Sequence, residues 1–164
     1  MSRHAAPRSR GRGFTLIELL VTVVILSVLA LAAMPMAELT VQRAKESELR
    51  SALRQIREGI DAYKREVDDG RIARKVTDTG YPPTLEILVT GVEDEKSPNK
   101  QKIYFLRRIP RNPLVDDPQL SNAATWGKRS YASPPEEPKA GDDVFDVYPT
   151  GGGVGLNGIA YRDW

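Results

Sequence analysis

The sequence contains no cysteine and a single histidine, His4. A chain without cysteine forms no disulfide bond, no thiolate metal site and no cysteine nucleophile. Because His4 lies in the first 13 residues, ahead of the expected folded part, histidine-based catalysis is excluded from that part as well. These absences weigh against an enzyme, and no enzymatic activity is predicted.

Positive charge is scarce in the body of the chain. Of the 24 basic residues, four arginines precede Phe14, where no acid occurs: Arg3, Arg8, Arg10 and Arg12. The remaining 20 basic residues face 22 acidic ones, so the chain from Phe14 onward is slightly acidic. A nucleic-acid-binding domain concentrates positive charge on a folded face, so no nucleic-acid partner is predicted.

One long apolar run follows the basic residues 1–13. Residues 14–37 contain a single ionisable side chain, that of Glu18. An α-helix needs about 20 apolar residues to cross the hydrocarbon core of a bilayer, so this segment is expected to span a membrane once. Arginines before the segment and acids after it place the N-terminus in the cytoplasm and the remainder outside. Pro35 lies near the outer boundary and predicts a helix kink there.

Helical periodicity continues through residues 38–69. Apolar side chains recur there at alternating spacings of four and three residues, so they share one stripe: Leu49, Leu53, Ile56, Ile60, Tyr63 and Val67. The stripe is expected to pack against a globular head. Asp68, Asp69 and Gly70 are expected to end the helix, because glycine readily adopts the left-handed conformation of a helix stop.

Residues 70–164 are expected to form that head. Thr84–Thr90 predicts a short helix capped by Thr84, and a polar loop and a short apolar run follow it. Short strands, separated by stretches rich in Pro, Gly and Asp, are predicted at Ser130–Ala132, Val144–Tyr148 and Ile159–Tyr161. A small antiparallel sheet covered on one face by the amphipathic helix gives an α+β fold class.

The stretch "RGFTLIELLVTVVILSVLALAAMP" resembles the class III signal of type IV pilin-like proteins. The resemblance rests on the basic leader, Gly13, Phe14, Glu18 and the long apolar helix containing Pro35. It implies a type IV pilin-like fold. It also implies that a membrane prepilin peptidase removes residues 1–13 by cutting between Gly13 and Phe14, and that the new Phe14 amine is methylated. Glu18 is then tied to methylation and assembly.

The remainder of the chain resembles the head of major pseudopilins of type II secretion systems. The segments that carry this resemblance are "YPPTLEILVTG", "YFLRRIPRNPL", "WGKRSYASPP" and "DDVFDVYPTGGGVGLNGIAYRDW". It implies a structural subunit of a periplasmic pseudopilus that helps drive protein secretion, anchored in the bacterial inner membrane with its head in the periplasm. The implied partners are further copies of the chain, minor pseudopilins, the prepilin peptidase and an inner-membrane assembly platform.

The chain departs from that family at one place. Major pseudopilins commonly hold calcium in the C-terminal loop through several aspartates, but this chain has Gly151–Gly153 and Asn157 there. Calcium needs six to eight oxygen ligands and normally several carboxylates. No cofactor is predicted; the remaining candidate ligands for calcium are Asp142, Asp143, Asp146 and Asp163.

Glu18 has two interpretations. It can reach the headgroups, or sit favourably at the positive end of the helix dipole. Alternatively, cleavage gives Phe14 a positive amine about one helical turn away, and Glu18 pairs with that amine in a neighbouring subunit or in its own chain. Ionisable residues inside membranes usually mark function, which favours pairing.

Other functions remain as alternatives. The chain could be a pilin of a type IV pilus or DNA-uptake filament, or a membrane-anchored periplasmic binding domain or enzyme. The glycine run lacks a complete nucleotide-binding motif, and acids clustered on a loop are more often solvated than catalytic. An ordinary cleaved signal peptide is disfavoured because the apolar run is long.

Overall fold

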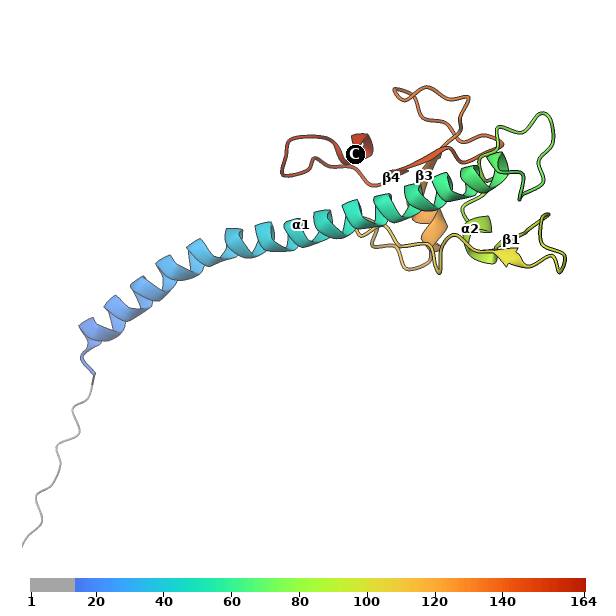
Figure 1. The fold of residues 1–164 in the computed structure, drawn as a ribbon. Coiled ribbons are helices and arrows are strands. Elements are labelled where there is room, and N and C mark those ends of the chain that lie inside the picture. The colour runs from blue at the N-terminus through green and yellow to red at the C-terminus, as the bar shows by residue number, and fades with distance from the viewer. Residues whose placement is uncertain (1–13) are drawn as a thin grey trace, which may run out of the picture. The chain divides into compact units, whose positions relative to one another are not determined.

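The computed structural model describes residues 14–164, except for the side chains of residues 32–37. The predicted leader, including Gly13, and the side chain of Pro35 therefore lie outside the described part. The chain divides into two compact units, with the boundary between Val41 and Gln42. A single helix, α1 (Leu16–Asp68), contributes to both (Figure 1).

The first unit consists of the N-terminal part of α1 with its apolar side chains exposed. Phe14 is 87% exposed, and the large apolar residues from Leu16 to Leu31 are exposed as well. Within the described residues, no helix has enough length and hydropathy to qualify as a membrane-crossing segment. The predicted span includes residues 32–37, whose side chains the structure does not describe. The helix kink predicted at Pro35 therefore stays a prediction.

In the second unit, Gln42–Trp164, the rest of α1 forms one wall of the core. All six residues of the predicted stripe are buried, and Leu49 and Ile56 are fully enclosed. They pack in one cluster with Leu85, Leu88 and Val147 of the head. Burying one such aliphatic side chain contributes about 1.5–3 kcal/mol, so the stripe is the main apolar attachment of the helix to the head. The predicted packing is confirmed.

The end of α1 also follows the prediction. The last helical residue is Asp68, and Gly70 has a φ of 69°. The Gly70 amide donates to the Val67 carbonyl at 2.9 Å, and the Arg71 amide donates to the Glu66 carbonyl at 2.9 Å. These bonds satisfy carbonyls that the helix end leaves without partners.

The head contains two small antiparallel sheets. β1 (Val92–Glu93) pairs with β2 (Lys102–Ile103), and β3 (Trp126–Arg129) pairs with β4 (Asp146–Pro149). Trp126 lies opposite Pro149 and Arg129 lies opposite Asp146. Three short helices complete the head: α2 (Ile87–Thr90), a 3₁₀ helix at Asn122–Thr125 and another at Tyr161–Asp163. The α+β, type IV pilin-like fold class is confirmed.

Several predicted element boundaries are wrong. The helix expected from Thr84 begins only at Ile87, and the residue before it, Glu86, makes no capping bond with its side chain. The polar loop after it contains the β1–β2 hairpin. The chain leaves β2 after Ile103, because the amides of Phe105 and Leu106 both donate to the Leu88 carbonyl, at 3.0 and 2.9 Å.

The other predicted strands shift for similar reasons. β3 ends at Arg129, because the Ser130 amide donates to the Lys139 carbonyl at 2.9 Å and the chain turns away. β4 begins only at Asp146, since the Val144 amide donates to the Pro82 carbonyl at 2.8 Å. The expected strand at residues 159–161 is reduced to one bridge, between Val154 and Ala160, followed by a 3₁₀ helix.

Candidate functional site

The first turn of α1 contains a reciprocal cap formed by Thr15 and Glu18. The Thr15 amide and hydroxyl each donate to Glu18 Oε2 at 2.9 Å, and the Glu18 amide donates to Thr15 Oγ1 at 3.3 Å. This is the capping box, which the pattern Thr-x-x-Glu signals in a sequence. Neither predicted interpretation of Glu18 included this cap. The carboxylate therefore has a local partner even before any other subunit is considered.

The hydroxyl groups further along this apolar stretch are bonded within the helix. Thr22 Oγ1 donates to the Leu19 carbonyl at 2.9 Å, and Ser27 Oγ donates to the Val23 carbonyl at 2.7 Å. A hydroxyl in an apolar environment costs free energy unless it is hydrogen-bonded. The surface from Phe14 to Leu31 thus presents apolar groups, and the hydroxyls of Thr15, Thr22 and Ser27 are all hydrogen-bonded within the segment, as burial in lipid or among other helices requires.

A second cluster of polar contacts joins α1 to the C-terminal loop, residues 150–160, and to the 3₁₀ helix after it. Its centre is Glu46, which is only 5% exposed. Glu46 Oε1 accepts hydrogen bonds from the Leu156 amide at 2.8 Å, the Tyr161 hydroxyl at 3.0 Å and Gln42 Nε2 at 3.3 Å. Glu46 lies three residues before Leu49, on the edge of the apolar stripe. An acidic residue at the edge of the apolar stripe was the sequence signal that could have identified Glu46 as a buried polar contact.

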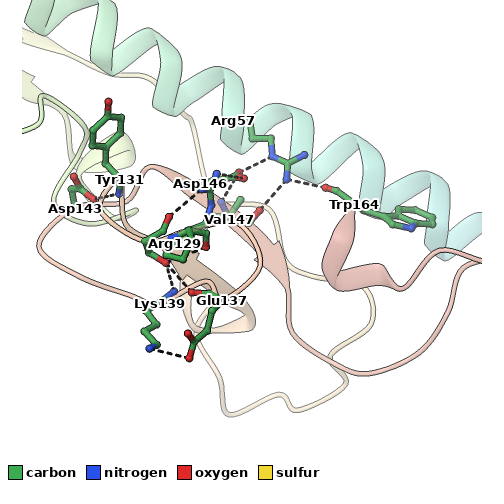
Figure 2. Close-up of polar contacts among 11 residues, drawn as sticks. Arg57, Arg129, Tyr131, Glu137, Lys139, Asp143, Asp146, Val147 and Trp164 are labelled. Atoms are coloured by element: carbon green, nitrogen blue, oxygen red, sulfur yellow. Dashed lines mark hydrogen bonds and ion pairs between the residues drawn. The ribbon is translucent and has the colours of Figure 1, made fainter.

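Arg57 makes the corresponding contacts about three turns further along α1 (Figure 2). Its Nε donates to Asp146 Oδ1 at 2.8 Å, and its Nη2 donates to the carbonyls of Val147 at 3.2 Å and Trp164 at 2.9 Å. The guanidinium of Arg50 lies 4.4 Å from the ring centroid of Trp164, a cation–π contact. The helix is therefore connected to β4 and to the end of the described chain.

The "RRIPRNPL" segment also has a structural role. Asn112 is fully buried, and its Nδ2 donates to the carbonyls of Thr125 at 3.1 Å and Thr150 at 2.9 Å. The buried Trp126 donates from Nε1 to the Pro110 carbonyl at 2.8 Å. These bonds connect the segment to the start of β3 and to the residue after β4. The buried Trp126 is thus a packing residue.

An ion cluster holds the β1–β2 hairpin near the end of α1. Arg71 lies 2.6 Å from Asp94 and 2.8 Å from Glu66. The hydrogen bond from Arg71 is the main cause that lowers the pKa of Asp94, and the same bond raises the pKa of Arg71. The Glu95 amide adds a hydrogen bond of 2.8 Å to the Arg71 carbonyl, so backbone and side chain act together.

The candidate calcium ligands are not brought together. Asp143 accepts hydrogen bonds from the Thr79 hydroxyl and the Tyr131 amide, and Asp146 pairs with Arg57 and with Arg129. Asp163 lies 3.5 Å from Arg162, and Asp142 is exposed. Within residues 14–164, as far as their side chains are described, no three His, Cys, Asp or Glu side chains gather as a metal site.

Comparisons with known proteins agree on one family. Residues 8–34 match the family model described as the prokaryotic N-terminal methylation motif. The type II secretion system core protein G of Pectobacterium carotovorum subsp. carotovorum is 33% identical over 141 residues, covering 82% of this chain and 83% of that protein. The proteins of the same name from Klebsiella pneumoniae and Dickeya chrysanthemi are 31% and 30% identical, covering 82% and 91% of this chain and 93% and 94% of their own lengths.

No solved structure gives a significant match. The sequence relatives nevertheless align over most of both chains, and the methylation motif falls on the segment where Phe14 and the Thr15–Glu18 cap begin the helix. This chain therefore belongs to the core protein G family of type II secretion systems, the major pseudopilins.

Proposed function

We propose that this chain is a non-catalytic structural subunit of a pseudopilus, in which the N-terminal parts of many α1 helices pack together. The observation that carries the proposal is the composition of α1, a helix of 53 residues. Its first part exposes apolar side chains on all faces, and its last part buries a stripe in the head. Such an exposed apolar surface is unfavourable in water, so it requires lipid or neighbouring helices.

In the precursor, residues 14–37 would cross the inner membrane once, with the N-terminus in the cytoplasm and the head in the periplasm. The internal hydrogen bonds of Thr22 and Ser27 support burial of this stretch in an apolar medium. In the filament, the same surface would contact neighbouring helices. Minor pseudopilins and an inner-membrane assembly platform would be the remaining partners during growth.

The prepilin peptidase would cut between Gly13 and Phe14, and the new Phe14 amine would be methylated. Both Thr15 donors converge on Glu18 Oε2, and Oε1 has no partner within the described residues 14–164. Oε1 therefore remains available to a positively charged Phe14 amine of a neighbouring subunit. An ion pair formed in an apolar environment is stronger than one in water, which would favour docking of a new subunit.

The decisive experiment is mass spectrometry of the protein isolated from its native membranes. The expected mass corresponds to loss of residues 1–13 and addition of one methyl group on Phe14. A full-length mass, or a cut near Ala37, would overturn the proposal. Deletion of the gene distinguishes secretion from pilus function: loss of protein export is expected, whereas intact export with loss of surface fibres or DNA uptake would indicate a pilin.

A further inference from the structure

The C-terminal loop lacks the ligand set that a calcium ion would need. Residues 150–160 contain no Asp or Glu. Of the nearest acids, Asp146 is paired with Arg57 at 2.8 Å, and Asp163 lies beside Arg162 at 3.5 Å. A calcium site requires several carboxylate oxygens around one point, and these two are held by cationic side chains. The residues present do not fit a bound calcium.

The interior of the loop is also filled by protein atoms. A Cβ atom added at Gly155 would lie 2.4 Å from Cζ2 of Trp164 and 2.7 Å from Oδ1 of Asn157. That Asn157 oxygen accepts the Ile159 amide at 3.1 Å, and the Gly155 amide donates to the Ile159 carbonyl at 2.8 Å. The loop thus packs against its own backbone and against Trp164. The side-chain oxygen of Asn157 is already occupied by a hydrogen bond within the turn.

We propose that the carboxylate of Glu46 takes the place of a calcium ion and holds the C-terminal loop in a calcium-independent conformation. Its Oε1 accepts from the Leu156 amide in the loop and from the Tyr161 hydroxyl just after it, at 2.8 and 3.0 Å. These partners lie 110 and 115 residues away in the sequence. One negatively charged oxygen on α1 therefore binds hydrogen-bond donors of the C-terminal segment, whereas a metal ion would bind oxygen acceptors of the loop.

Burial makes this contact strong. Glu46 is 5% exposed and Tyr161 is 6% exposed, so water competes poorly for their hydrogen bonds. Hydrogen bonds to an ionised acceptor are about twice as strong as neutral ones. Arg50 Nη2, 4.0 Å from Glu46 Oε2, supplies a counter-charge at the solvent side. The contact is independent of the N-terminal processing site, so it can be tested whether or not the proposed assembly mechanism holds.

The first test compares thermal unfolding of the full-length, detergent-solubilised protein in EDTA and in about 10 mM calcium, above the ~0.1–1 mM dissociation constants of extracellular calcium modules. The two melting temperatures are expected to agree within about 1 °C, because a ligand that binds only the folded state would raise the melting temperature. A calcium-dependent rise of roughly 5 °C or more, or stoichiometric calcium in the purified protein, would overturn the proposal.

The second test removes the carboxylate. Glu46→Ala is expected to lower the melting temperature by roughly 5 °C or more and to increase amide hydrogen exchange at Leu156, with no recovery in calcium. The matched control is Glu48→Ala, which removes an exposed glutamate from the same helix. Equal behaviour of the two variants would contradict the role of Glu46.

A third variant keeps the proposal testable if Glu46→Ala fails to fold. Tyr161→Phe removes only the hydroxyl that donates to Glu46 and keeps the aromatic ring that packs 5.1 Å from the ring of Trp164. It is expected to fold and to increase hydrogen exchange in residues 154–161 while leaving β3 and β4 protected. Unchanged exchange in that loop would refute the proposed contact. Secretion and the mass of the processed protein are separate readouts that report only on the proposed function.

Discussion

Replacing Arg57 by alanine should uncouple α1 from β4 and from Trp164. The substitution removes three hydrogen bonds of 2.8, 3.2 and 2.9 Å, which go to Asp146 and to two backbone carbonyls. Asp146 then keeps the hydrogen bond from the Val147 amide at 2.8 Å, but its remaining cationic contact is the longer one with Arg129, at 3.5 Å. The helix would keep its apolar stripe, so the head should still fold but should unfold at a lower temperature.

The size of the stability loss in Arg57→Ala follows from the solvent exposure of the groups involved. Hydrogen bonds to charged groups contribute about 1.5–3 kcal/mol each, and neutral ones about 1 kcal/mol. The Arg57 side chain is 39% exposed and that of Asp146 is 27% exposed, so solvent screening reduces these values. A total loss of about 2 kcal/mol is expected. For a folded unit of this size, that corresponds to a decrease of roughly 5–10 °C in melting temperature.

Circular dichroism or differential scanning fluorimetry of the detergent-solubilised full-length protein measures this decrease. Arg54→Ala is the matched control, because Arg54 is exposed and makes no hydrogen bond or ion pair among the described residues 14–164. A double-mutant cycle with Asp146→Asn isolates the ion pair from the two carbonyl contacts. If Arg57→Ala and Arg54→Ala shifted the melting temperature equally, the assigned role of Arg57 would be refuted.

Three further predictions test other parts of the chain. Glu18→Val should leave membrane insertion intact but reduce filament assembly, measured by electron microscopy and cross-linking; normal filaments would remove the proposed role of Glu18. Gly127→Ala should lower the melting temperature, since its Cβ would lie 2.3 Å from the Tyr148 ring, whereas Gly152→Ala, with nothing within 4 Å, should not. Acid should weaken the Asp94 contact with Arg71. The pKa of Asp94 is lowered by folding, so its stabilisation is present above the unfolded value near 3.8 and is lost as pH falls through the lower folded value. Asp94→Asn should flatten the acid limb of stability against pH, and an unchanged limb would contradict the assignment.

The boundaries of the short elements show where prediction from sequence failed. Thr84 precedes an apolar run and has the right chemistry for a cap, yet α2 begins at Ile87. Phe105 and Leu106 follow β2 closely and are apolar, but their amides donate to the Leu88 carbonyl instead of extending the strand. Elements of two to four residues form few hydrogen bonds of their own. Their ends are therefore decided by the nearest available partner in the folded chain.

The sequence by itself determined the long helix, its apolar first part, its buried stripe and its stop at Gly70. Each depends on neighbours within about one helical turn, so local periodicity and glycine placement carry the information. The same holds for Glu18, whose Thr15 partner is three residues away. The Thr-x-x-Glu pattern of residues 15–18 predicts that cap from sequence alone.

Only the tertiary structure decided the roles of Glu46, Arg57 and Asn112. Their long-range partners lie 13 to 115 residues away. The local sequence pattern does not indicate which donor or carbonyl these side chains will contact. A buried polar group is favourable only when a distant segment brings a matching partner, so its role follows from packing. For the same reason the sequence could show that the C-terminal loop lacks carboxylates. It could not show that a glutamate on the helix reaches into that loop.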